Sequence, residues 1–150
     1  MIDLLNLLAT LAIGLFAGAL LTEGCILVPY WRAMEPSEFL QRHSEMGPSL
    51  FRYFAPLTTA AVLLSVFAAI ASQFSGPAIN GQVLAALMSV AALSVFFVYF
   101  KTANEKFASQ RISEKELPTE LAKWSNWHWL RTALVIGAFA ISIWGLKGGI

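Results

Sequence analysis

The chain has 150 residues, of which 57% are hydrophobic and only 13% charged, with a net charge of +1. Soluble globular domains carry roughly 25% charged residues, so this composition excludes an ordinary soluble domain and places the excess apolar surface against lipid. The ten Lys and Arg residues are scattered rather than gathered in a basic stripe, which excludes nucleic acid as a partner. The length suits a single membrane domain covering residues 1–150.

Four apolar segments are each close to the roughly 20 residues that a helix needs to cross a bilayer. They lie at about residues 4–28, 53–74, 83–100 and 130–146. The chain is therefore predicted to be all-α, an integral membrane four-helix bundle whose outer surface contacts membrane lipid. The Gly14-x-x-x-Gly18 spacing favours close helix packing within the chain, while a homo-oligomer or a larger membrane complex stays open.

A short interfacial helix is predicted over residues 35–48, between the first two spans. Pro36 suits the first helical position, and Gly47-Pro48 is typical of a helix end. Four side chains share the apolar face of this helix: Phe39, Leu40, His43 and Met46. His43 is therefore expected to face the membrane or the bundle.

The second long connection also contains helix. The third helix is expected to continue past Asn104, and the last one to begin near Pro118. Spacings of four and three residues place Trp124, His128 and Arg131 on one face of this last helix. Because Arg131 is costly in lipid, that face is expected to turn towards the bundle.

The orientation follows from the basic residues. Nine of the ten Lys and Arg residues lie in or beside the connections after the first and third spans, and Lys147 is the exception. Basic residues stay in the cytoplasm, so both connections are expected there. The turn at residues 75–82 and both termini are then expected outside the cytoplasm, in a cell inner membrane.

Glu23 is an acidic residue inside the first apolar span. A charge at such a position usually faces the bundle and has a partner, for which Arg52 and Arg131 are the candidates. Two interpretations stay open. Glu23 either locks two helices together or acts as a carboxylate that handles protons or binds a ligand.

Polar residues from three chain segments are expected to line one pocket at the cytoplasmic mouth of the bundle. The candidate catalytic residues are His128, Asn104 and Arg131, and the candidate ligand-binding residues are Trp124, His43, Glu23 and Arg52. A metal would need three converging ligands, for instance His43, His128 and Glu23, but no spacing motif indicates one. We therefore expect no metal, haem or other cofactor.

Several further aromatic residues lie where an interfacial belt is expected. They are Tyr30, Trp31, Trp127 and Trp129. Trp124 differs from them because it shares the face of His128 and Arg131. It is a candidate wall of an aromatic ligand site, although core packing explains it equally well.

The chain resembles the anthrone-oxygenase-like family of small four-helix membrane proteins. The resemblance covers nearly the whole chain. It rests on Phe16-Ala17-Gly18 in the first span, the following Pro29, Asn104 in KTANEKF, and Trp124-x-x-x-His128-x-x-Arg131 in KWSNWHWLRTAL. The closing Trp-His-Arg motif is the most specific part.

The resemblance implies an oxygenase-like protein that binds an aromatic or quinone-like lipophilic small molecule and oxidises it without a cofactor. In that reaction His128 suits the base, Asn104 and Arg131 suit the stabiliser of an oxyanion, and Trp124 suits the apolar slot. The alternative is a non-catalytic accessory or binding subunit of a larger membrane complex. A ligand-shaped cavity favours the enzyme, and a packed, paired polar cluster favours the accessory subunit.

Overall fold

The computed structural model describes residues 2–74 and 80–146, and all regular structure in these ranges is helical. The first span consists of α1 (Ile2–Thr22), the π-helical turn η1 (Glu23–Leu27) and α2 (Val28–Arg32). The third span is built in the same way, from α4 (Gly81–Val95), the π-helical turn η2 (Phe96–Phe100) and α5 (Lys101–Ala108). The second span is α3 (Pro36–Ser72) and the fourth is α6 (Leu117–Leu146).

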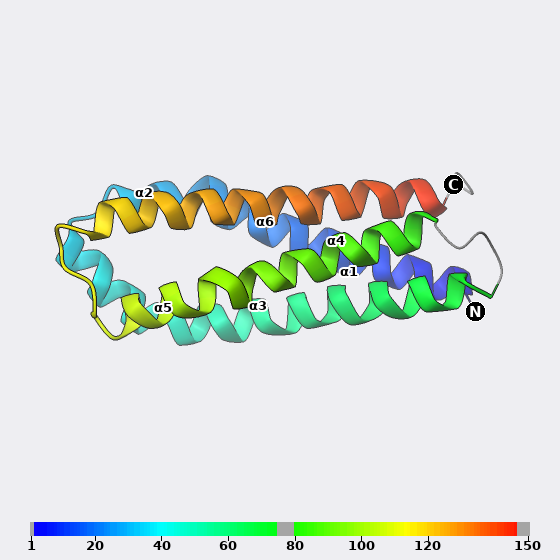
Figure 1. The fold of residues 1–150 in the computed structure, drawn as a ribbon, viewed down its shortest axis with the longest axis horizontal. Coiled ribbons are helices and arrows are strands. Elements are labelled where there is room, and N and C mark those ends of the chain that lie inside the picture. Colours follow the sequence, from blue (N-terminus) through cyan, green and yellow to red (C-terminus); the bar gives the residue numbers. More distant parts are fainter. Residues whose placement is uncertain (1, 75–79, 147–150) are drawn as a thin grey trace.

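These helices form an elongated four-helix bundle, as the sequence predicts (Figure 1). All four spans are long and apolar enough to cross a membrane. α1 packs against α3 and α6, and α4 packs against the same two helices, so the spans stand at the corners of a square. The N-terminal end of α1 and the C-terminal end of α6 lie at one end of the bundle, and the connection between α5 and α6 lies at the other (Figure 1).

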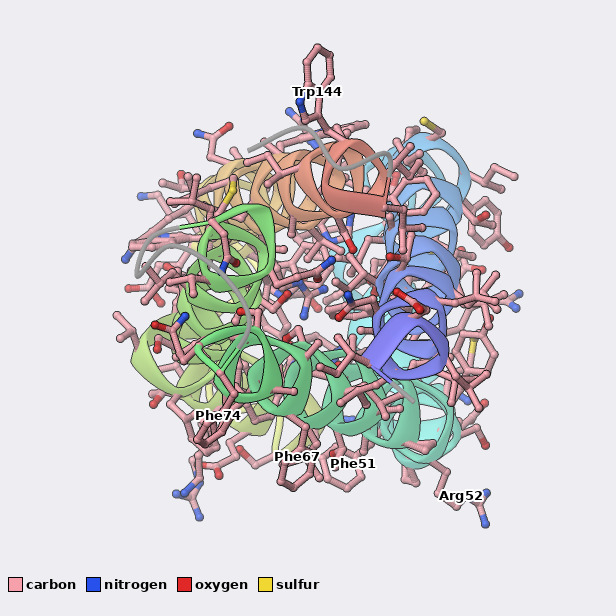
Figure 2. All side chains as sticks on the ribbon, turned by 90° about the vertical axis from the view of Figure 1, so that its right-hand side faces the viewer. Phe51, Arg52, Phe67, Phe74 and Trp144 are labelled. Carbon is pink, nitrogen blue, oxygen red and sulfur yellow. The ribbon has the colours of Figure 1, made fainter. Side chains whose placement is uncertain are left out.

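The apolar surface is distributed as a membrane environment requires. Large side chains such as Phe67 and Trp144 point outward from the bundle (Figure 2), whereas the centre is filled with small residues such as Ala85 and Ala138. Gly14 allows one close approach, since a Cβ there would lie 2.6 Å from the ring of Phe139. The excess hydrophobicity of the sequence therefore lies on the outside, where lipid can solvate it.

The prediction of a separate interfacial helix over residues 35–48 is wrong in one respect. The helix begins at Pro36 as expected, but it does not end at Gly47-Pro48 and continues unbroken to Ser72. A proline inside a helix removes one backbone hydrogen bond, and the packing of the long helix outweighs that loss. At 37 residues, α3 is about 55 Å long, so it extends well beyond a hydrocarbon core of about 30 Å.

The predicted face of the first part of α3 is largely confirmed. Phe39, Leu40 and His43 are buried, whereas Met46 is exposed. The prediction for the turn at 75–82 falls mostly on residues 75–79, which lie outside the described residues. Within the described part of that turn, Asn80 caps α4 by accepting bonds from the amides of Gln82 and Val83 at 3.1 and 3.2 Å.

The connection before α6 is held by local hydrogen bonds. The Ser113 hydroxyl donates to the Glu116 carboxylate at 2.6 Å, and the Glu116 amide donates back to Ser113 Oγ at 3.3 Å. The bond from Ser113 holds the pKa of the exposed Glu116 below its ordinary value. This reciprocal arrangement resembles a capping box and starts α6 at Leu117, close to the predicted start near Pro118.

Candidate functional site

A cluster of three ionisable side chains, Glu23, His128 and Arg131, lies inside the bundle and is called the polar cluster below. Glu23 comes from η1, and the other two come from α6. Arg131 Nη2 lies 3.2 Å from Glu23 Oε2 and 3.3 Å from His128 Nδ1. Glu23 Oε2 lies 3.5 Å from His128 Nδ1. The predicted partner of Glu23 is therefore Arg131, and the shared face of His128 and Arg131 does turn inward.

The polar cluster is almost completely buried. His128 has no exposed surface, Glu23 is 5% exposed and Arg131 is 8% exposed. The Arg131 guanidinium also lies over the ring of Phe100, 4.4 Å from its centroid. Charges in such surroundings are costly unless paired, so the pair of Glu23 and Arg131 fixes η1 against α6 at this level.

Each end of the His128 ring is bonded. His128 Nε2 lies 3.0 Å from the carbonyl oxygen of Leu20 and 3.3 Å from Thr132 Oγ1. The close approach to α1 depends on Gly24, where a Cβ would lie 3.0 Å from His128 Nε2 and 3.1 Å from the ring of Trp129. Only a residue without a side chain fits there without a shift of its neighbours.

Trp124 covers one face of His128. The two rings are stacked with centroids 5.3 Å apart and planes 6° from parallel. Asn104 Oδ1 accepts a hydrogen bond of 3.0 Å from the Trp124 indole, and the ring of Trp31 packs edge-on against this indole with centroids 5.6 Å apart. Asn104 therefore holds Trp124 in place, and its side chain bonds that indole and not the polar cluster.

His43 lies in an aromatic layer beyond Trp124. Its ring contacts Phe39 at 5.4 Å, Phe107 at 5.3 Å and Trp31 at 6.4 Å between centroids. Two indoles, Trp31 and Trp124, thus stand between His43 and His128. Within the described residues His43 Nδ1 is buried and has no hydrogen-bond partner. The structure therefore places the two histidines at separate positions joined by a chain of contacting rings, and not in one pocket as predicted.

Arg52 does not belong to the candidate site. Its side chain is exposed, donates a hydrogen bond of 3.2 Å to Ser49 on its own helix, and points away from the bundle (Figure 2). The structure therefore does not bring Arg52 together with the other predicted ligand-binding residues. The reason is its position on α3, on the face opposite the buried residues.

Four residues of the predicted pocket pack against one another: Glu23, Trp124, His128 and Arg131. A cavity of about 120 Å³ lies nearer than these residues to the end of the bundle where α5 connects to α6. It is lined by Arg32, Met34, Pro36, Leu117, Pro118 and Leu121. Leu121 precedes His128 by seven residues, which is about 10 Å along α6. The cavity is therefore separate from the polar cluster, with Trp124 between them along the helix.

Two features of this region were not predicted. Trp31, expected in an interfacial belt, is buried against Trp124, whereas Tyr30 and Trp129 are exposed as a belt requires. The turns η1 and η2 were also not predicted, and each is followed by a residue that contacts Trp124. Trp31 lies four residues after Leu27, the end of η1, and Asn104 lies four residues after Phe100, the end of η2. Turns of this kind often occur at functional sites.

The polar cluster brings together a carboxylate, a guanidinium and an imidazole under a flat indole, groups that can transfer a proton and stabilise an oxyanion. Within residues 2–74 and 80–146, no three His, Cys, Asp or Glu side chains are grouped closely enough to hold a metal ion. Comparison with known proteins finds no protein-family model, no curated protein and no solved structure that matches the chain significantly.

Proposed function

We propose that the protein is a membrane-embedded, oxygenase-like enzyme that acts on an aromatic or quinone-like lipophile at the polar cluster. One observation supports this proposal above the others. Arg131 Nε is buried and has no hydrogen-bond partner among the described residues, although the same guanidinium bonds both Glu23 and His128. A buried donor without an acceptor is costly, and a carbonyl or phenolate oxygen of a ligand supplies the acceptor.

The chemistry that the family resemblance suggests suits these groups. An anthrone carries an acidic C–H bond between two aromatic rings. A base removes that proton, and the resulting enolate reacts with O₂ to give an anthraquinone and water, with one oxygen atom in each product. His128 is the base in this proposal, and Arg131 stabilises the enolate oxygen in surroundings that exclude water.

The test is oxygen uptake by the purified protein in detergent, with an anthrone as the substrate. His128→Ala is expected to reduce the rate by about 10²-fold or more, the usual contribution of a general base. Val135→Ala is the matched control, because Val135 is buried in the same helix and belongs to a separate apolar core. The control should keep its rate. Equal rates in wild type and His128→Ala would contradict the proposal.

The second candidate is an accessory subunit in which the polar cluster only holds helices together. It is favoured by the packing of His128, which has no exposed surface and a hydrogen bond at each ring nitrogen. In that case wild-type protein takes up no oxygen with anthrones, and the cluster variants change thermal stability alone.

The proposed membrane is a cell inner membrane, with both termini outside the cytoplasm, because of the nine basic residues in and beside the two connections. In intact cells, and in a Cys25→Ser background, Ser75→Cys should react with an impermeant maleimide. Lys115→Cys should react only after the membrane is broken. The reverse pattern would overturn the orientation.

A further inference from the structure

The hydrogen bonds around His128 determine which ring nitrogen carries the proton. A backbone carbonyl can only accept, so the bond of 3.0 Å to Leu20 O requires a hydrogen on Nε2. Thr132 Oγ1 lies 3.3 Å from the same nitrogen, and its own hydroxyl donates to the His128 carbonyl at 2.8 Å. The Thr132 oxygen is therefore left to accept, which agrees with a proton on Nε2.

The other nitrogen, Nδ1, must be an acceptor. Its nearer polar neighbour, Arg131 Nη2 at 3.3 Å, can only donate, whereas the Glu23 carboxylate oxygen lies farther away at 3.5 Å. This Nη2 has two hydrogens, and its second acceptor is Glu23 Oε2 at 3.2 Å. A hydrogen on Nδ1 would oppose the Arg131 hydrogen directly. A neutral imidazole with its lone pair on Nδ1 satisfies the hydrogen bonds to Leu20, Thr132 and Arg131, with Glu23 ionised and the cluster neutral in total.

We infer that His128 acts through Nδ1. The Leu20 carbonyl and Gly24 are the positioning elements that make Nδ1 the proton acceptor. Arg131 covers this nitrogen in the resting protein. The inference rests on the proposed function for its role in catalysis. The protonation state itself follows from the contacts alone.

The inference gives the proposed reaction an order of events. A ligand oxygen that binds Arg131 draws the guanidinium away from Nδ1 and uncovers the lone pair. The proton from the ligand C–H bond then moves to Nδ1, and the electron pair of that bond stays on the ligand as an enolate. The imidazolium that forms lies between the Leu20 carbonyl and the Glu23 carboxylate, the latter 3.5 Å from Nδ1, and both stabilise its charge.

Gly24 is a positioning residue because of where its missing side chain would lie. A methyl group there would be 3.0 Å from Nε2 and 3.2 Å from Cδ2 of His128. Either the ring or α1 must then shift, and the bond from Nε2 to Leu20 lengthens. Without that bond, only the contacts of Thr132 with Nε2 and of Arg131 with Nδ1 select the tautomer, so Gly24→Ala should add a measurable population of the Nδ1–H form.

The experiment is nitrogen-15 NMR of the full-length protein in detergent, labelled in histidine, at neutral pH. The chain has two histidines, and a His43→Gln sample assigns the signals. Protonated and unprotonated ring nitrogens resonate far apart. The wild-type His128 should show Nε2 protonated and Nδ1 unprotonated. An Nδ1–H tautomer or a doubly protonated ring would overturn the inference, whether or not the protein consumes oxygen.

Two variants test the positioning elements in the same spectra. Gly24→Ala should populate both tautomers, whereas Gly18→Ala should not, since a Cβ at Gly18 meets nothing within 4 Å. Arg131→Met removes the guanidinium that covers Nδ1, together with its positive charge. One proton should therefore bind between Nδ1 and the Glu23 carboxylate, and isotope labels in both His128 and Glu23 detect it. An unchanged tautomer in Gly24→Ala, or no added proton in Arg131→Met, would contradict the assigned roles. Where a variant does not fold, the wild-type spectrum still decides.

Discussion

Glu23→Ala is expected to lower the stability of the detergent-solubilised protein by about 3–5 kcal/mol, because it leaves the Arg131 guanidinium buried and unpaired. Arg131 is 8% exposed, and its only carboxylate partner within the described residues is Glu23 at 3.2 Å. The measurement is the thermal unfolding midpoint, followed by circular dichroism or by the loss of monodisperse protein on heating.

The chain offers a matched control for this prediction. Glu38 pairs with Arg42 at 3.0 Å, but both side chains are about half exposed. Exposed pairs four residues apart in a helix contribute only about 0.3–0.5 kcal/mol, so Glu38→Ala should change the midpoint very little. Equal effects of the two substitutions would show that Glu23 is hydrated or that its pairing is not maintained in the folded protein.

Gly24→Ala is expected to have the second largest effect. The added methyl group overlaps with His128 and Trp129, and overpacking of this kind commonly costs about 1–3 kcal/mol. Gly18→Ala, six residues earlier in the same span, meets no neighbour within 4 Å and should gain up to about 1 kcal/mol of helix propensity. The two alanines should therefore shift the unfolding midpoint in opposite directions. A stabilising Gly24→Ala would show that His128 does not approach α1 as described.

The fold could be predicted from composition and length because lipid leaves few alternatives. An apolar segment of about 20 residues must form a helix in the bilayer, since no water is present to bond its backbone. The prediction from local helix-end signals failed at Gly47-Pro48, because this pair lies inside α3. Local preference at one proline is a few kcal/mol at most, and the packing of a continuous helix exceeds it.

Part of the candidate site could also be predicted. The spacing of Trp124, His128 and Arg131 requires a shared face, and an arginine in a membrane span requires a buried partner. The sequence could not distinguish Arg131 from Arg52 as the partner of Glu23, because both lie near the same end of their spans. The structure shows that the partner is Arg131. The sequence pattern gives depth along the bundle, but it does not specify which way each helix is turned.

The π-helical turn η1 explains why Trp31 is buried and does not lie in the expected interfacial belt. Such a turn contains one extra residue, so everything beyond it is rotated by roughly 100° relative to an uninterrupted α-helix. In η1 the amide of Val28 bonds to the carbonyl of Glu23, five residues earlier. Trp31 follows this turn and therefore faces the interior. A hydrophobic pattern read at one fixed period cannot locate an insertion of this kind.

The central claim is that the polar cluster exists for chemistry and not only for holding helices together. Replacing a buried ion pair by apolar residues of similar size is often neutral or stabilising. The double variant Glu23→Leu/Arg131→Met should therefore unfold close to the wild-type midpoint, which removes stability as an explanation for any loss of activity.

The most direct test is oxygen uptake by this double variant with an anthrone, compared with wild type in the same detergent. The account predicts a folded protein in which wild type consumes oxygen and the double variant does not, because the group that binds the ligand oxygen is gone. A folded double variant that consumes oxygen at the wild-type rate would contradict the claim, and so would a wild type that takes up none.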